Sequence, residues 1–169
     1  MSENSAKLLP QLVSAKRMAE IEHWVAKYPV EERQSAVMAA LRVVQEEHNH
    51  LTTELMNAVA EYLQMPAIAV YEVASFYTMY EHKPVGRHVI NVCTNISCML
   101  CGSSKVVDYL EKKLAIKLGE TTDDGQYTLR SVECLGACVN APMMQVDKDY
   151  HENLTPEKID KVLEKYDER

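Results

Sequence analysis

Hydrophobic residues in the first half of the chain recur at the three- and four-residue spacing of amphipathic helices. Pro29 ends the first such run, and Thr52 or Thr53 is a suitable N-cap for the third. The fourth run is apolar over more than one face, so we expect that helix to be buried on more than one side. Residues before Ser14 show no such spacing and are predicted to be a loose lead. The pattern thus predicts four helices, over residues 15–28, 31–47, 53–63 and 67–80.

The period changes after Pro84 and Gly86, where short runs rich in strand-forming residues begin. Strands are predicted over residues 88–92, 127–132 and 143–146, with 147–153 as a possible hairpin partner, and helices over residues 102–115 and 156–166. Thr155 and Pro156 mark the start of the last helix as N-cap and first helical residue.

These elements predict an α+β fold in two parts. An N-terminal helical bundle, residues 1–84, is followed by an α/β domain, residues 85–169. The order β-α-β-β-α with short strands is typical of a thioredoxin-like domain with a small mixed sheet.

Composition and charge exclude several classes of protein. The chain has 169 residues, of which 47% are hydrophobic and 25% charged, which is typical of a globular protein able to form its own core. Its net charge of −7 argues against a nucleic-acid partner. We expect no signal peptide, because no apolar run follows the charged start, and no direct insertion into a membrane. A cytoplasmic location is therefore expected, where cysteines are more often ligands or free thiols than disulfides.

Four of the five cysteines form two pairs. Cys93 and Cys98 follow one predicted strand, and Cys134 and Cys138 follow another, in the pattern C-x4-C-x35-C-x3-C. A [2Fe–2S] cluster takes four thiolates, two for each iron. We therefore predict one such cluster on these four residues. Gly136, inside the second loop, would let backbone N–H groups turn toward the sulfurs.

Other groups near the cysteines are candidates for adjusting the reduction potential of the cluster. The helix that begins at Gly102 would present free N–H groups to a negatively charged cluster. Thr94 and Asn95 are candidate hydrogen-bond donors to the same cluster.

Cys101 leaves three alternatives open. Cys93, Cys98 and Cys101 match the opening of the plant-type ferredoxin spacing, but that arrangement would leave one cysteine of the second pair unused. Cys98 and Cys101 alone form the C-x-x-C of a thioredoxin-like thiol oxidoreductase. They also have the spacing of a zinc knuckle, whereas neither favoured pair does. We interpret Cys101 as a spare thiol.

Other candidate sites are weaker. The pair His48 and His50 lies in a polar break between helices, where solvated histidines are more common than metal ligands. Aromatic residues of the fourth helix fit a core or a partner interface. No hydrolytic constellation and no G-x-G-x-x-G dinucleotide motif is present, so we predict no catalytic residue on this chain.

Three segments carry a resemblance to a known family. They are Val70-Tyr-Glu-Val-Ala-Ser-Phe-Tyr77, Val92-Cys93-Thr-Asn-Ile-Ser-Cys98, and Glu133-Cys134-Leu-Gly-Ala-Cys138 followed by Ala141-Pro-Met143. From about residue 15 to residue 166, the chain resembles the 24 kDa subunits of proton-pumping NADH:quinone oxidoreductase (respiratory complex I), which are thioredoxin-like [2Fe–2S] ferredoxins.

The resemblance implies an electron-transfer role within a larger complex. Cys93, Cys98, Cys134 and Cys138 would hold the cluster, and position 101 is not a ligand in that family. A partner flavoprotein subunit would hold the FMN that exchanges electrons with the cluster, together with the NADH site. The chain would reach the inner membrane only through partner subunits. Related diaphorase subunits serve NAD-linked hydrogenases and formate dehydrogenases, and the sequence separates these possibilities less well.

Overall fold

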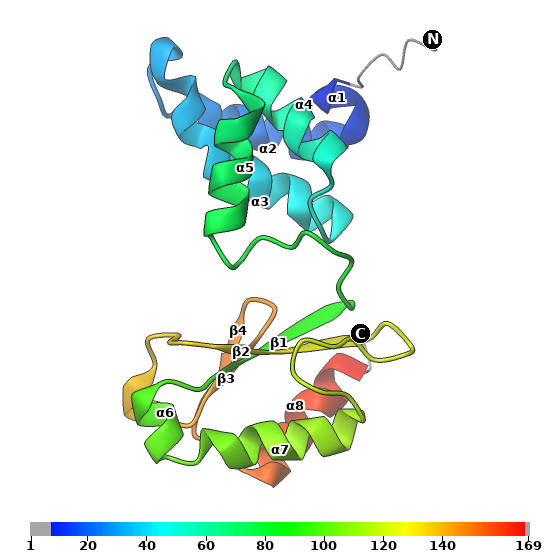
Figure 1. Ribbon diagram of the computed structural model, residues 1–169, viewed down its shortest axis with the longest axis vertical. Helices are drawn as coiled ribbons and strands as arrows, with labels where there is room; N and C mark the ends of the chain where they lie inside the picture. Colours follow the sequence, from blue (N-terminus) through cyan, green and yellow to red (C-terminus); the bar gives the residue numbers. More distant parts are fainter. Residues whose placement is uncertain (1–7, 168–169) are drawn as a thin grey trace. The chain divides into compact units, whose positions relative to one another are not determined.

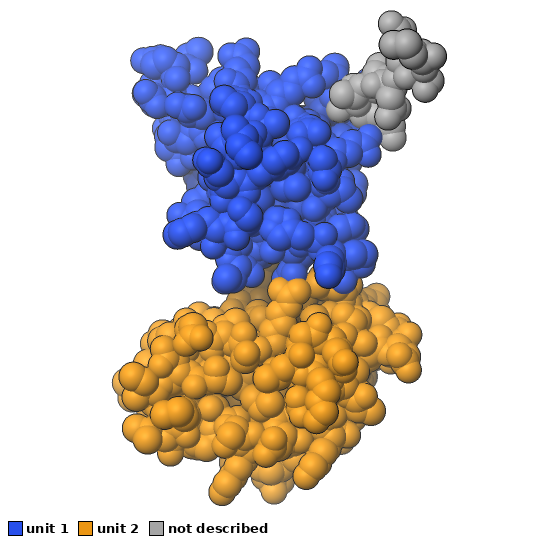
Figure 2. Space-filling view, viewed as in Figure 1, with its two compact units in different colours: residues 1–84 blue, residues 85–169 orange. Residues whose placement is uncertain are grey.

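The computed structural model describes residues 8–167. The chain divides into two compact units, Met1–Pro84 and Val85–Arg169 (Figure 2). Each unit has its own hydrophobic core. No helix in the described part of the chain has the length and apolar character needed to cross a membrane.

The first unit is a bundle of helices (Figure 1). Its α-helices are α1 (Leu9–Leu12), α2 (Ala15–Val25), α3 (Val37–His48), α4 (Thr53–Leu63) and α5 (Ala67–Phe76), with a 3-10 helix, η1 (Val30–Ala36), before α3. Ser14 and Thr52 cap α2 and α4, since their side chains accept hydrogen bonds from N–H groups of the first turn. The four predicted helices are confirmed, although the second begins as η1.

Two predictions for this unit are wrong. The expected loose lead contains α1, because Leu9 and Val13 bury their side chains in the core; the first seven residues of that lead lie outside the described part. Helix α5 ends at Phe76 rather than near Tyr80 and buries only Val70 and Ala74. Its other apolar residues remain in contact with solvent, so it is not buried on several sides: Ile68 is 64% exposed and Phe76 is 76% exposed.

The second unit is built on a four-stranded mixed sheet. The strands are β1 (His88–Cys93), β2 (Tyr127–Val132), β3 (Met144–Val146) and β4 (Asp149–His151), in the order β2-β1-β3-β4. β1 pairs parallel with β2 and antiparallel with β3, and β4 completes a hairpin with β3. The predicted fold class, a helical part followed by a domain with a small mixed sheet, is confirmed.

Helices α7 (Ser103–Leu114) and α8 (Pro156–Asp167) cover one face of this sheet (Figure 1). Ile90 pairs with Leu129 on one side and Val146 on the other, and all three are fully buried in the core beneath these helices. A short helix, α6 (Ile96–Leu100), was not predicted. It directly follows β1 and contains Cys98, so it determines where that thiol lies.

Candidate metal centre

Strand β1 ends at Cys93 and places this thiol beside the loop that follows β2. The Cys93 N–H donates to the carbonyl of Met143 at 3.2 Å. Its sulfur donates to the carbonyl of Glu133 at 3.5 Å, one residue before the second cysteine pair. The side chain is almost fully buried. The two cysteine loops, far apart in sequence, therefore meet at the ends of the parallel strands β1 and β2.

Helix α6 holds Cys98 in the same buried place. The Asn95 side chain accepts a hydrogen bond from Ile96 N–H at 2.7 Å and caps this helix, and Cys98 N–H donates to the Asn95 carbonyl. Burial, a hydrogen bond with Cys93 and the nearby charges of Cys93 and Cys138 raise the pKa of the Cys98 thiol to about 11. A hydrogen bond from the Met143 backbone N–H acts in the opposite direction. Cys98 thus lies close to members of both pairs.

The loop after β2 presents the second pair to solvent. The sulfurs of Cys134 and Cys138 lie 3.9 Å apart, and both residues are exposed. Between them, Gly136 adopts a positive φ of 82° that most side chains would disfavour. This conformation lets the Gly136 N–H donate to the sulfur of Cys134 at 3.4 Å, as the sequence led us to expect.

A small apolar cluster lies beneath the four thiols. Met143 is 1% exposed and forms this cluster with Cys93 and Cys98, while Leu135, Ala137 and Ala141 pack against it. We did not predict a role for Met143 at the site from the sequence. An apolar residue soon after the second pair was the available signal, but its contact with Cys98 depends on how the segment before β3 packs.

The donor set fits a cluster with two irons. Cys93 and Cys98 are hydrogen-bonded to each other, and Cys134 lies beside Cys138. Within residues 8–167, no three His, Cys, Asp or Glu side chains surround one point in a way that could hold a single metal ion. A four-cysteine zinc site needs all its sulfurs around one ion, whereas a [2Fe–2S] cluster takes two thiolates per iron. The pairwise arrangement therefore favours the two-iron centre.

Cys101 lies outside this arrangement. It is the exposed C-cap residue of α6, and its N–H donates to the Ser97 carbonyl. The C-x-x-C alternative needs an accessible first thiol, but Cys98 is only 1% exposed. This geometry argues against a thiol oxidoreductase that uses Cys98 and Cys101.

Other groups expected near the site have different partners. The Thr94 hydroxyl donates to the Val132 carbonyl at 3.3 Å, and the Asn95 side chain caps α6. His48 and His50 each use a ring nitrogen in a hydrogen bond with a backbone carbonyl, of Leu12 and of His48 respectively. These four side chains thus serve local structure.

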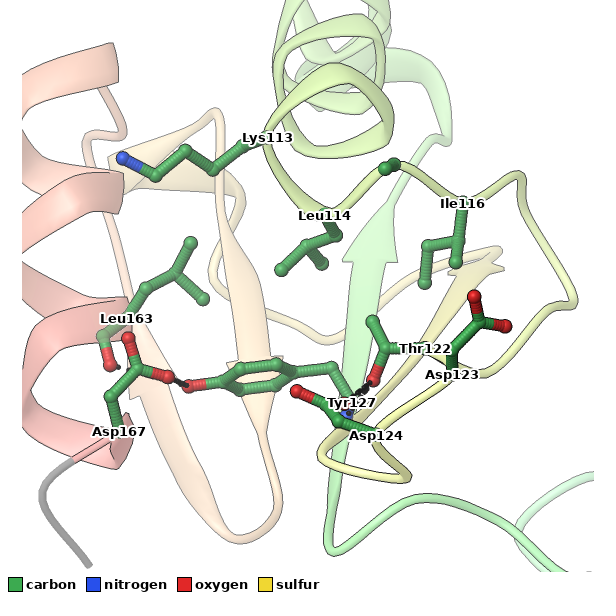
Figure 3. A pocket seen from close by; sticks show the side chains of 10 residues that line it. Lys113, Leu114, Ile116, Thr122, Asp123, Asp124, Tyr127, Leu163 and Asp167 are labelled. Atoms are coloured by element: carbon green, nitrogen blue, oxygen red, sulfur yellow. Dashed lines mark hydrogen bonds between the residues drawn. The ribbon is translucent and has the colours of Figure 1, made fainter.

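Two clefts in the second unit lie apart from the paired cysteines. One, of about 430 Å³, lies between the end of α7, the loop before β2 and α8, and Tyr127 crosses it toward Asp167 (Figure 3). The Tyr127 hydroxyl donates to the Asp167 carboxylate at 2.7 Å. Burial and this carboxylate raise the pKa of Tyr127. A second cleft, of about 420 Å³, is lined by Cys101, Lys105 and Pro142 among others.

Comparisons with known proteins agree with this geometry. The family model "Thioredoxin-like [2Fe-2S] ferredoxin" matches residues 21–167. The E subunit numbered 2 of the NADH-quinone oxidoreductase of Rhizobium meliloti (strain 1021) is 48% identical over 147 residues, which cover 87% of this chain and 86% of that protein. The NADH-quinone oxidoreductase E subunit of Rickettsia felis is 44% identical over 146 residues, 86% of this chain and 87% of that protein.

A solved structure shares the fold. The NAD+-reducing [NiFe]-hydrogenase in its H2-reduced state superposes with a TM-score of 0.68 and 21% identity over 79% of this chain and 22% of the hydrogenase chain. At this identity, the similarity concerns the fold alone.

Proposed function

Because the chain belongs to the thioredoxin-like [2Fe–2S] ferredoxin family, we propose that it is an electron-transfer subunit of an NADH-quinone oxidoreductase. The relatives that carry this name are 44–48% identical to it over most of both chains. The observation that carries the proposal is the meeting of Cys93 and Cys98 with the loop of Cys134 and Cys138 over one apolar floor.

In this proposal the four paired cysteines hold one [2Fe–2S] cluster, which takes up and returns a single electron when bound. Cys93 and Cys98 would hold one iron from the buried side, and Cys134 and Cys138 the other from the exposed loop. The Gly136 N–H and the Met143 N–H, which already donate to Cys134 and Cys98, would stabilise the negative charge on the sulfurs. Met143 would exclude water from the buried side of the site.

Exposed apolar side chains next to the cysteines support a protein partner at this site. Ile96, Met99 and Leu100 of α6 are 66%, 55% and 77% exposed, and Val139, next to Cys138, is 97% exposed. Apolar side chains gathered around a redox centre are typical of a docking surface. We propose that a flavoprotein subunit holding FMN and the NADH site docks here. In this arrangement the chain exchanges electrons with that FMN and is attached to the membrane only through partner subunits.

Membership of an NAD-linked hydrogenase or formate dehydrogenase is the second candidate. The structural similarity to the hydrogenase has 21% identity, whereas the NADH-quinone oxidoreductase relatives reach 44–48%. The closer sequence relationship favours the quinone-linked complex.

Metal analysis of the purified chain tests the proposal. We expect about two irons and two acid-labile sulfides per chain, a brown colour, and an EPR signal of a reduced [2Fe–2S] cluster. The Cys134→Ser variant should lose most of this iron, whereas Cys101→Ser, which changes another exposed thiol, should keep it. A colourless chain with one zinc, or equal loss of iron in both variants, would refute the assignment. Measurable NADH oxidation by the chain alone would contradict the role given to the flavoprotein.

A further inference from the structure

The four paired thiols differ sharply in how accessible they are. Cys93 and Cys98 are 2% and 1% exposed, and both belong to the apolar cluster with Met143. Cys134 and Cys138 are exposed and belong to the loop that contains Gly136. A reagent in solution therefore reaches the second pair before it reaches the first.

The second pair is also close enough to react with itself. The sulfurs of Cys134 and Cys138 are separated by 3.9 Å, so a shift of about 2 Å would bring them to bonding distance. A β-carbon at Gly136 would have no atom within 4 Å, so the loop has open space at its turn. Movement of this loop therefore requires no rearrangement of a packed side chain at Gly136.

We propose that, in the chain without its cluster, Cys134 and Cys138 are a redox modification site at which a low-molecular-weight disulfide such as glutathione disulfide closes a reversible intrachain bridge. One thiolate of the pair attacks a sulfur of the small disulfide, a mixed disulfide forms, and the first small thiolate leaves. The other cysteine sulfur then attacks the mixed disulfide and releases the second small thiol. The pair loses two electrons and two protons, and the small disulfide is reduced to two thiols.

This bridge gives the buried and exposed pairs different fates. Cys93 and Cys98 remain as protected thiols, while the bridge removes two of the four sulfurs that a [2Fe–2S] cluster needs. Reduction of the bridge restores all four. The block on cluster assembly rests on the proposed function, whereas formation of the bridge itself does not.

Peptide mapping of the full chain tests the bridge directly. Chain freed of iron by chelation under anaerobic conditions is treated with glutathione disulfide, alkylated, and digested without reduction. We expect the peptide with Cys134 and Cys138 to lose about 2 Da, because two thiol hydrogens are removed. Cys93 and Cys98 should become alkylated only after denaturation, and Cys101, the exposed thiol outside the pairs, should carry a glutathione adduct.

Two variants serve as controls. Cys138→Ser should stop at a glutathione adduct on Cys134, and Cys101→Ser should form the same bridge as the natural sequence. Bridges that include Cys93, Cys98 or Cys101, or stable adducts on both Cys134 and Cys138, would overturn the proposal.

Iron uptake by the bridged chain then tests the consequence. Uptake should be lost and should return after dithiothreitol, and unchanged uptake without a reductant would refute the block on assembly. A correctly mapped bridge in a chain whose reduced form takes up no iron would support the modification site while refuting the proposed function.

Discussion

His151 is a residue whose protonation the fold opposes. It ends β4 beside the ring of Tyr166, with 6.1 Å between ring centroids, and its Nε2 atom is buried without a hydrogen-bond partner among the described residues. Burial lowers its pKa below the ordinary value of 6.5, and Lys165 and Lys158 act in the same direction, while Asp149 acts against them. The folded chain therefore favours the neutral ring.

This preference predicts a loss of stability in mild acid. With its folded-state pKa lowered, the neutral ring contributes its full stability above the unfolded pKa of 6.5, and this contribution is lost as the pH falls below that value. Urea unfolding of the cluster-free chain between about pH 7.5 and pH 5.5 should show this decrease. His151→Gln should make the decrease shallower, whereas His23→Gln, at an exposed position on α2, should leave the slope unchanged. Equal slopes in all three chains would exclude the effect.

At the same residue scale, sequence spacing was informative about the cysteines and silent about their surroundings. It grouped Cys93 with Cys98 and Cys134 with Cys138, and the structure brings the two pairs together. It could not distinguish the buried pair from the exposed pair, because that difference depends on where Met143 packs. The contact between Met143 and Cys98 joins residues 45 positions apart, and no local pattern reports such a distance.

Among the elements, β2 leaves no room for a side chain at Gly86. A β-carbon added there would lie 2.8 Å from the Tyr127 carbonyl carbon and 3.0 Å from the Thr128 nitrogen, both of which are backbone atoms of β2. The Gly86 N–H also donates to the Thr128 hydroxyl at 2.7 Å. The chain entering β1 is thus pressed directly against its parallel neighbour.

Gly86→Ala should therefore lower the free energy of unfolding of the second unit by about 1–3 kcal/mol, the usual cost of overpacking. Gly125→Asn is a suitable control, because Gly125 has a positive φ of 69° that Asn tolerates and has open space around it. The control should remain within about 0.5 kcal/mol of the natural sequence in denaturant unfolding followed by circular dichroism. If Gly86→Ala is equally neutral, β2 yields more readily than the close approach implies.

Elements were predicted where hydrophobic periodicity was long, and missed where tertiary contacts decide. Helices α2 to α5 and α7 to α8 followed from spacing and caps. Helices α1 and α6 contain only 4 and 5 residues, too few to show a period. For α5 the pattern gave the helix correctly but not its burial, since apolar faces such as the one bearing Phe76 are not covered by the described part of this chain.

In the molecule as a whole, the two units have separate cores. The core of the first unit lies between Leu9 and Tyr80, and the main core of the second lies between Ile90 and Tyr166. All four paired cysteines belong to the second unit. We therefore propose that the boundary near Pro84 separates a helical domain from an independent cluster-binding domain.

This division predicts that residues 85–169, produced alone, fold and bind the cluster. The fragment keeps the whole sheet, both covering helices and the apolar cluster around Met143, and its length exceeds the roughly 40 residues below which domains usually need extra staples. Its iron content and reduced EPR spectrum should match those of the full chain, and the same fragment with Cys134→Ser should lose the iron. A fragment with no cooperative unfolding transition would show that the second core depends on residues 1–84. A folded fragment with an altered EPR signal would instead show that the helical domain influences the electronic environment of the cluster.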